Sequence, residues 1–359
     1  MSVTMLDCIK RTPKCLRDII DNAMGNTQGV INYLGEDVKR INEIIVIGSG
    51  SSYNAAITAN SFMEKAAGLP VRPYVPNQFV KKELYNPEAL YVFVSQTGTS
   101  ALVEDMVRKV NDMGYRTMAI TEHSHTPVSL VAHCHMDVGC GYEEFGYRTV
   151  GFCCTIFSLQ LLAMRIGLER EHITEKDFDA YLKDAEKVIE NQPLIVEKTL
   201  KWFDQHQEVL KKANTVYYYG SGELYGIAIE AALKLLETAR LYRSVGYEAE
   251  DGLHGPNLGF MKDDIVISMC DGENDINYSR NVVRFAKNEL LAGFSVGDAV
   301  LDENDLQFKC ASHDFRAIEF AAVVEIIAYQ MAIINDVPVQ DMKHRVPHVS
   351  TKYFVTHRG

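Results

Sequence analysis

Three charged residues at helical spacing are the first candidates for chemistry in this chain. In the segment Glu-Ala-Ala-Leu-Lys-Leu-Leu-Glu, Glu230, Lys234 and Glu237 stand at i, i+4 and i+7, and these positions share one face of an α-helix. Carboxylate and lysine side chains are typical of general acid–base catalysis. The spacing alone favours a simpler interpretation, a surface ladder of ion pairs that contributes about 0.2–0.5 kcal/mol per pair.

A histidine among carboxylates follows this helical pattern. Residues 246–256 read Gly-Tyr-Glu-Ala-Glu-Asp-Gly-Leu-His-Gly-Pro, which predicts that the helical pattern stops in a glycine-flanked turn carrying His254. Such turns often position functional side chains. Histidine titrates near neutral pH, and neighbouring carboxylates tune it further. The two segments together therefore favour proton transfer over a surface ladder.

Two turns rich in hydroxyl groups follow apolar runs earlier in the chain. Residues 44–47 lead into Gly-Ser-Gly-Ser-Ser, and residues 90–94 lead into Ser-Gln-Thr-Gly-Thr-Ser. A turn between a buried strand and a helix presents backbone N–H groups and a helix N-terminus, which bind anions and most often phosphate. The alternative is that these Ser and Thr residues only cap helices.

Nucleotide binding is disfavoured at the first turn. A P-loop requires a Gly-Lys-Ser/Thr sequence, which is missing here. Tyr53 stands where a dinucleotide site needs its third glycine, and the apolar segment 70–75 ends without the carboxylate that would bind a ribose.

The elements around these turns alternate between strand and helix. A helical segment at 5–42, with a loop at Gly25-Asn26, comes first, and a parallel sheet with helices on both faces is expected to follow. The expected elements are strands at 44–47, 71–75, 90–94, 116–120 and 136–139, with helices from 51 through 66 and from 100 to 113.

The second half of the chain repeats this order, which indicates two copies of one fold. Gly220-Ser-Gly222 corresponds to Gly48-Ser-Gly50, but Glu223 and Leu224 replace the hydroxyl groups, so the second copy is expected not to bind phosphate. Its further expected elements are strands at 265–269 and 299–301 and helices at 277–291 and 315–334. The charged segment 169–213 predicts bridging helices with a break at 192–193. The predicted parts are 1–170, 171–213, 214–340 and a C-terminal tail at 341–359.

Composition excludes several classes of protein. The net charge of −12 argues against a nucleic-acid surface. The eight cysteines have irregular spacing and no export signal precedes them, which predicts reduced thiols in a cytoplasmic protein. The apolar segment 149–168 is interpreted as a buried helix, so no membrane partner is expected.

The histidines and cysteines between His123 and Cys140 do not match a zinc spacing, and neither a metal nor a cofactor is predicted.

The two hydroxyl-rich turns, taken together, resemble the sugar isomerase (SIS) family, whose members hold phosphosugars. The segments 230–237 and Leu253-His-Gly-Pro256 resemble the isomerase part of glucosamine-6-phosphate synthase and, more closely, the fructosamine-6-phosphate (fructoselysine-6-phosphate type) deglycases. The resemblance runs from about residue 30 to the C-terminus. It implies an α/β fold of two tandem SIS domains, each a parallel sheet flanked by helices in a flavodoxin-like three-layer sandwich.

The resemblance also implies roles for particular residues. Glu237 matches the general base, and His254 matches the residue that opens the sugar ring or acts as general acid, in several relatives across a dimer interface. Lys234 or His254 would protonate the leaving nitrogen. Lys352 is the nearest match by position to a lysine of the synthase that can form a Schiff base with the open-chain ketose. Relative to the synthase, the turn near Asp251 carries one extra residue. The phosphate cradle and the other substrate contacts would be Ser51, Ser52, Ser95, Gln96, Thr97, Ser100, Arg148 and Glu230.

The sequence therefore predicts a homodimeric phosphosugar enzyme that cleaves the C–N bond of a 6-phosphorylated ketosamine, giving glucose 6-phosphate and an amine. No glutaminase domain is expected, because the chain begins Met-Ser-Val and has no room for one. A glucosamine-6-phosphate deaminase, an aldose–ketose isomerase and a phosphosugar-sensing module remain alternatives, and the departing amine is left open.

Overall fold

The computed structural model describes residues 3–272, 276–340 and 356–357. The chain forms two compact units. The first unit comprises residues 14–143, 150–183 and 343–359, and the second comprises residues 1–13, 144–149 and 184–342.

The first unit is built on a parallel sheet in the order β2-β1-β3-β4-β5. The central strands are continuous apolar runs that are buried on both faces, as expected of a parallel sheet covered by helices. The strands are β1 (Glu43–Gly48), β2 (Val71–Tyr74), β3 (Ala89–Val94), β4 (Arg116–Thr121) and β5 (Cys134–Asp137).

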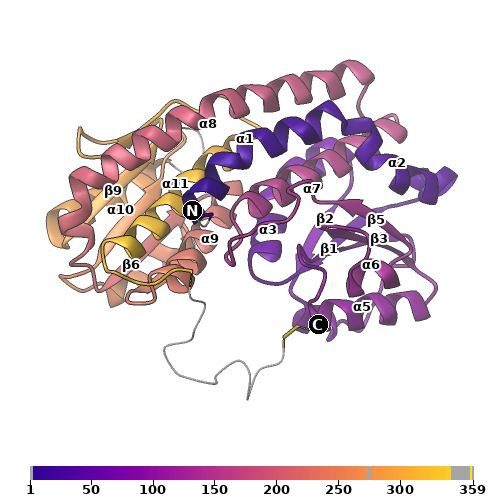
Figure 1. Cartoon of the computed structure of the whole chain (residues 1–359), viewed down its shortest axis with the longest axis horizontal. Coiled ribbons are helices and arrows are strands. Elements are labelled where there is room, and N and C mark those ends of the chain that lie inside the picture. The colour runs from indigo at the N-terminus through magenta and orange to yellow at the C-terminus, as the bar shows by residue number, and fades with distance from the viewer. Residues whose placement is uncertain (1–2, 273–275, 341–355, 358–359) are drawn as a thin grey trace. The chain divides into compact units, whose positions relative to one another are not determined.

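Helices cover this sheet (Figure 1). α3 (Ser51–Ala67) packs along α7 (Val150–Glu169), while α5 (Ala101–Asp112) packs on α6 (Pro127–Val131). Among the described helices, α7 alone is long and apolar enough to cross a membrane, and it is buried in the protein core. The remaining helices of this part are α1 (Met5–Asp21), α2 (Ala23–Leu34), the 3-10 helix η1 (Gly35–Lys39) and α4 (Pro76–Phe79).

The predicted loop at Gly25-Asn26 is wrong. The helical segment breaks at Asn22 instead, and Gly25 lies inside α2. Asn26 explains the position of the break, because its side-chain amide donates to the carbonyl oxygen of Ile19 near the end of α1 at 3.2 Å. Asn22 in turn donates to the side chain of Asn26 at 2.9 Å.

The second unit repeats the topology with a parallel sheet in the order β10-β9-β8-β6-β7. Its strands are β6 (Thr215–Gly220), β7 (Arg243–Glu248), β8 (Ile265–Met269), β9 (Ala292–Gly297) and β10 (Leu306–Gln307). Its helices are α9 (Glu223–Thr238), the 3-10 helices η2 (Asp251–Leu253) and η3 (Pro256–Gly259), α10 (Ile276–Glu289) and α11 (Arg316–Ile333). The expected tandem α/β architecture is confirmed.

Three local predictions for this half are wrong. α8 (Glu175–Leu210) continues through Pro193 without the predicted break, since the buried residues Ile189, Ile195 and Val196 anchor it on both sides of the proline. Residues 299–301 form no strand, because the Asp305 carboxylate accepts the backbone N–H of Leu301 at 2.7 Å and folds this stretch into a turn. Residues 246–248, predicted as the beginning of the glycine-flanked turn, belong to the strand β7.

Candidate active site

The two hydroxyl-rich loops start side by side at one edge of the first sheet. β1 and β3 are neighbours, and Gly48 pairs in register with Val94, so the loops leave adjacent strands at the same level. Each loop leads into a helix N-terminus, α3 at Ser51 and α5 at Ala101. Gly50 adopts φ 55° and ψ −128°, a backbone conformation that a residue with a side chain rarely reaches. Two helix N-termini with hydroxyl groups between them give this edge the chemistry that could bind an anion.

The side chains of the second loop support one another. Ser95 Oγ donates to Ser100 Oγ at 3.0 Å, and the hydroxyl oxygens of Thr97 and Thr99 lie 2.9 Å apart. Ser95 and Gln96 are buried, whereas Thr97 and Ser100 are half-buried, as are Ser51 and Ser52 in the first loop. The structure thus gathers all six predicted cradle residues at one sheet edge, with partly accessible hydroxyl groups that could bind phosphate oxygens.

Glu143 is a residue that the sequence did not assign to the cradle. Its carboxylate is buried and accepts Gln96 Nε2 at 3.0 Å and the backbone N–H of Gly151 at 3.3 Å. Glu143 therefore fixes the amide of Gln96 against the start of α7. The only signal in the sequence was its place in an acidic pair before a glycine-containing segment.

Gly151 offers a direct test of the cradle. A Cβ atom at this position would lie 1.9 Å from Gln96 Oε1, so the substitution Gly151→Ala must displace the Gln96 side chain. We expect the Kd for glucose 6-phosphate, measured by calorimetry, to rise about tenfold, because one hydrogen bond to a charged group is lost. Gly29→Ala is the matched control, since its Cβ would meet only ordinary contact at 3.8 Å in α2. Equal affinities in the two variants would remove Gln96 from the cradle.

The described end of the C-terminal region lies against the same loop. The backbone N–H of Ala101 donates to the carbonyl oxygen of Thr356 at 3.1 Å, and Ser100 forms an antiparallel bridge with His357. Lys352 lies outside the described residues, so its predicted contact with the sugar stays a prediction.

The second unit carries the predicted catalytic helix, α9. Lys234 Nζ lies 2.8 Å from Glu237 Oε2 and 3.3 Å from Glu230 Oε1. Glu230 and Lys234 are buried, and only Glu237 reaches solvent, with 34% of its side chain exposed. Burial lowers the pKa of Lys234, but Glu230 and Glu237 outweigh it, and the net effect raises that pKa. The surface-ladder interpretation is therefore wrong, and Lys234 is a buried ammonium that holds one accessible carboxylate.

Arg240 fixes the end of this helix, and the sequence did not indicate it. Its Nε donates to the carbonyl oxygen of Glu237 at 2.9 Å, and its Nη2 forms a short hydrogen bond with the hydroxyl group of Tyr147. The guanidinium also lies over the Tyr147 ring. Arg240 has a positive φ of 57°, an uncommon conformation outside glycine that is found at functional sites. Together these contacts restrain the turn that carries the Glu237 carboxylate.

His254 lies in a turn that follows β7 and η2. The turn is held by Glu248, whose carboxylate accepts the backbone N–H groups of Glu250 and Asp251 at 2.8 and 3.1 Å. The His254 side chain is 83% exposed, and its Nδ1 lies 3.7 Å from Glu250 Oε1. In the described residues His254 forms no ion pair with Glu237, so its catalytic role stays a prediction.

Arg148, predicted to contact the phosphate, is half-buried in the segment 144–149, which belongs to the second unit. The neighbouring Glu144 pairs with Arg11, whose Nη1 lies 2.8 Å from its Oε2. The structure does not test a contact between Arg148 and a ligand.

At the equivalent edge of the second sheet, a buried arginine forms ion pairs with two carboxylates. By strand register, Glu223 and Asp271 correspond to Ser51 and Gln96 of the first copy. The buried Arg316 lies between them, with its Nη2 2.6 Å from Glu223 Oε1 and its Nε 3.1 Å from Asp271 Oδ2. Two carboxylates at this edge would repel phosphate, which supports the expectation that the second copy does not bind it.

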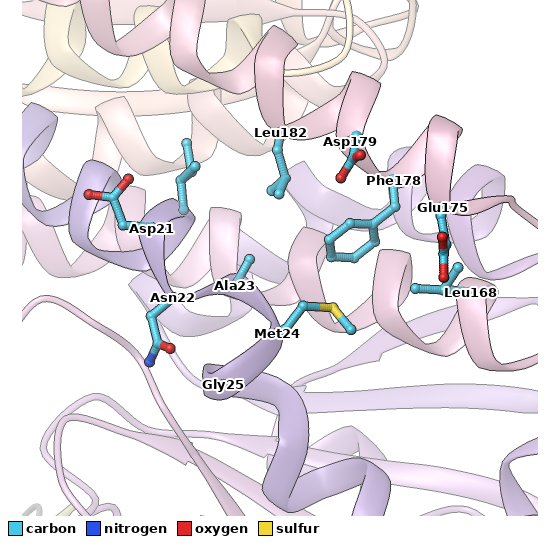
Figure 2. Close-up of a pocket in the computed structure, with 11 residues that line it drawn as sticks. Asp21, Asn22, Ala23, Met24, Gly25, Leu168, Glu175, Phe178, Asp179 and Leu182 are labelled. Carbon is cyan, nitrogen blue, oxygen red and sulfur yellow. The ribbon is translucent and has the colours of Figure 1, made fainter.

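A separate cavity of about 340 Å³ lies where α1, α2, α7 and α8 meet (Figure 2). Phe178, Leu168 and Leu182 form part of its wall, and three acidic side chains line it as well. None of the predicted site residues lines this cavity, so it is distinct from the hydroxyl-rich loops and from the charged cluster of α9. Among the described residues, no group of three potential metal ligands comes together.

Comparison with known proteins agrees with this geometry. Residues 38–165 match the SIS domain. These residues are thus a SIS domain, and the chain has the α/β fold of two tandem SIS domains.

Three proteins illustrate what the whole chain is similar to. Glutamine–fructose-6-phosphate aminotransferase (isomerizing) from Sulfolobus acidocaldarius is 24% identical over 92% of this chain and 53% of its own length. The chain thus spans about half the length of the curated relatives that it matches. A candidate phosphosugar isomerase from Clostridium difficile 630 has a TM-score of 0.89 at 22% identity, covering 98% of both chains. Glucosamine-6-phosphate deaminase from Thermotoga maritima has a TM-score of 0.71 at 20% identity, covering 92% of this chain and 96% of its own. The homologues are the isomerase part of the aminotransferase, and the fold is that of phosphosugar isomerases.

Proposed function

We propose that the protein cleaves the C–N bond of a 6-phosphorylated ketosamine, releasing glucose 6-phosphate and an amine. The observation that carries this proposal is the Lys234–Glu237 pair, in which a buried ammonium holds one solvent-accessible carboxylate. Such a carboxylate suits a base that removes a proton from carbon next to a carbonyl or imine. The hydroxyl-rich loops of the first unit supply the complementary function, a phosphate anchor that fixes the sugar chain.

The reaction divides into proton transfer and hydrolysis. His254 would assist opening of the sugar ring. Glu237 would then take a proton from C1 of the open-chain ketosamine and return one to C2. The C2 carbonyl oxygen gains a proton and the nitrogen loses one, so the C2=O double bond is replaced by a C1=N double bond. One water molecule adds to C1 of this imine, and the C–N bond breaks with its electron pair going to nitrogen. His254 would supply the proton to the leaving amine, and the C1 hydroxyl group loses its proton as the aldehyde forms. Lys234, the other predicted donor, is buried beside Glu230 and Glu237, and their charges raise its pKa, so it is a poor acid for this step. Water and the ketosamine phosphate thus give glucose 6-phosphate and the free amine.

The likeness to a glucosamine-6-phosphate deaminase supports a second candidate. The same carboxylate could shift a proton between C1 and C2 of glucosamine 6-phosphate, with ammonia as the leaving group. Both reactions need a phosphate anchor and a base near C1 and C2. The two candidates differ in the size and charge of the departing amine.

Product release separates the candidates. The substrate panel comprises fructose–amino acid conjugates phosphorylated at the 6-position, glucosamine 6-phosphate, and fructose 6-phosphate with ammonia. We expect glucose 6-phosphate from at least one conjugate, detected with glucose-6-phosphate dehydrogenase, and the preferred amino acid identifies the substrate. Ammonia from glucosamine 6-phosphate without any release from conjugates would replace the proposal with the deaminase. Binding without turnover would indicate a phosphosugar sensor.

The proposed active unit is a homodimer. The high exposure of His254 fits a residue that reaches the active site of a second copy, as the family resemblance implies. In that arrangement Glu237 and His254 of one active site belong to different subunits.

A further inference from the structure

A basic pocket of about 280 Å³ lies beside α10 in the second unit. α10 packs on the strands β8 and β9 of the second sheet (Figure 1). The lining of the pocket comes from this helix and from the turn that follows β9, and it consists of Arg280, Arg284, Lys287, Asn288, Leu301 and Asp302. The three basic residues stand at i, i+4 and i+7, so they share one face of α10. This basic face contrasts with the net charge of −12 of the whole chain.

Asp305 holds the turn that lines the pocket. Its side chain is buried and accepts the backbone N–H groups of Ser295, Leu301 and Asp302 at 3.0, 2.7 and 3.2 Å. Lys287 Nζ lies 2.8 Å from Asp305 Oδ1 and 2.9 Å from Asp302 Oδ1. The turn is therefore fixed before any ligand binds, and the charge of Lys287 is already offset within the protein.

The two arginines differ from Lys287 in this respect. Neither Arg280 nor Arg284 forms an ion pair with another residue in the described ranges. Arg284 is exposed, and its Nη1 donates to the neutral Asn281 Oδ1 at 2.8 Å. Arg280 is half-buried, and its Nε is buried without a hydrogen-bond partner. Like charges one helical turn apart repel each other, and partial burial of an unpaired guanidinium costs free energy. An anion in the pocket would reduce both costs.

We propose that this pocket binds a phosphate group through Arg280 and Arg284. Guanidinium groups present paired N–H donors that match phosphate oxygens. A phosphate monoester carries about −1.5 to −2 charges at pH 7, which two arginines offset and one carboxylate ligand would not require. The volume of about 280 Å³ lies at the lower end for small-molecule pockets, which suits free phosphate or a phosphorylated sugar and is too small for a dinucleotide.

This site is distinct from the proposed phosphate anchor of the catalytic reaction. The hydroxyl-rich loops belong to the first unit, whereas residues 280–302 belong to the second. The pocket also differs from the sheet edge that Arg316 occupies, because neither Arg316 nor its partners line it. The second copy would thus bind phosphate on a helix face rather than at the edge where the first copy carries its hydroxyl groups.

Calorimetry on the whole chain tests the site with inorganic phosphate and glucose 6-phosphate at constant ionic strength. We expect the double variant Arg280→Gln/Arg284→Gln to bind one phosphate group fewer per chain than the wild type. The loss is from two to one if the first-unit loops also bind phosphate, and from one to none if they do not. Each single substitution should raise the Kd at this site about tenfold, because hydrogen bonds to a charged group are lost. Equal stoichiometry and affinity in the wild type and the double variant would overturn the proposal.

The matched control removes two positive charges elsewhere in the same unit. Lys212 and Arg243 are both exposed, and Lys212→Gln/Arg243→Gln should bind like the wild type. The same loss in this control would attribute binding to overall charge and overturn the proposal. So would acetate that binds at this site as tightly as phosphate. Tighter binding of glucose 6-phosphate than of inorganic phosphate would identify a sugar phosphate as the ligand, and equal binding would identify the phosphate group alone.

Chemical modification of the wild-type protein locates the bound phosphate. Phenylglyoxal reacts with accessible arginines, and mass spectrometry gives the rate at each position. With glucose 6-phosphate at about ten times its Kd, the rate at Arg284 should fall about tenfold, because only the unliganded fraction reacts. Arg243 should react at an unchanged rate. An unchanged rate at Arg284 would overturn the proposal, even if the double variant does not fold. Neither measurement uses turnover, so an incorrect substrate in the proposed function leaves this test intact.

Discussion

Replacing Glu237 by glutamine should lower kcat by about 10³-fold, within the range for loss of a general base. Glutamine has nearly the same shape and can still accept a hydrogen bond from Lys234, which now lies 2.8 Å from the carboxylate. It cannot take a proton from carbon at neutral pH. The hydroxyl-rich loops, our proposed phosphate anchor, belong to the first unit and are untouched, so calorimetry should give a substrate Kd within about threefold of the wild type.

Two further variants make this result decisive. Glu208→Gln, on the exposed face of α8, is the control and should retain full activity. His254→Ala should also be inactive, and if active sites are shared between subunits, mixing it with Glu237→Gln should restore part of the turnover. Unchanged kcat in Glu237→Gln would exclude this carboxylate as the base. No recovery in verified mixed dimers would place both residues in one subunit.

Replacing Lys234 by methionine should give the largest loss of stability. The substitution removes a buried ammonium and takes from the carboxylate of Glu230, which is 0% exposed, the positive charge that lies 3.3 Å away. Breaking a buried ion pair in this way costs about 3–5 kcal/mol. The free energy of unfolding from urea denaturation at pH 7 measures the loss, provided that the transition stays two-state.

The control for Lys234→Met is the removal of an exposed lysine. Lys212→Met, at an exposed position after α8, should change the unfolding free energy by less than about 0.5 kcal/mol. Adding Glu230→Gln to Lys234→Met should recover part of the lost stability, because the uncompensated charge disappears. A Lys234→Met protein as stable as Lys212→Met would mean that the cluster adjusts by taking up protons.

The sheets could be predicted from the sequence because their central strands are buried on both faces. The apolar runs in β1 and β3 each end at a glycine or hydroxyl-rich turn, and those boundaries agree with the structure to within one or two residues. Proline and glycine residues gave wrong helix breaks where tertiary or side-chain contacts determine the structure. Pro193 is accommodated by buried neighbours, and the Asn22–Asn26 contacts move a helix break away from Gly25.

The sequence grouped the candidate site residues by type and spacing but did not indicate their surroundings. Helical spacing placed Glu230, Lys234 and Glu237 on one face, yet gave no indication that two of them are buried. The charge of Glu325 acts on Lys234 from a helix about ninety positions later in the chain, and no local pattern encodes that effect. Arg240 donates to the backbone carbonyl of Glu237, and Glu143 accepts the side-chain amide of Gln96. Short sequence motifs do not predict such contacts.

The Arg316 ion pair has a consequence for how the two halves respond to metabolites. The second unit holds an arginine between two of its own carboxylates at the sheet edge where the first unit, by our proposal, takes up a phosphosugar. Ligand binding stabilises a folded state by mass action, so the first unit should become more resistant to proteolysis and heat as its ligand accumulates. The second unit keeps its internal counterions at every ligand concentration. By our proposal, the duplicated fold thus combines one half that a ligand stabilises at this edge with one half whose counterions there are internal.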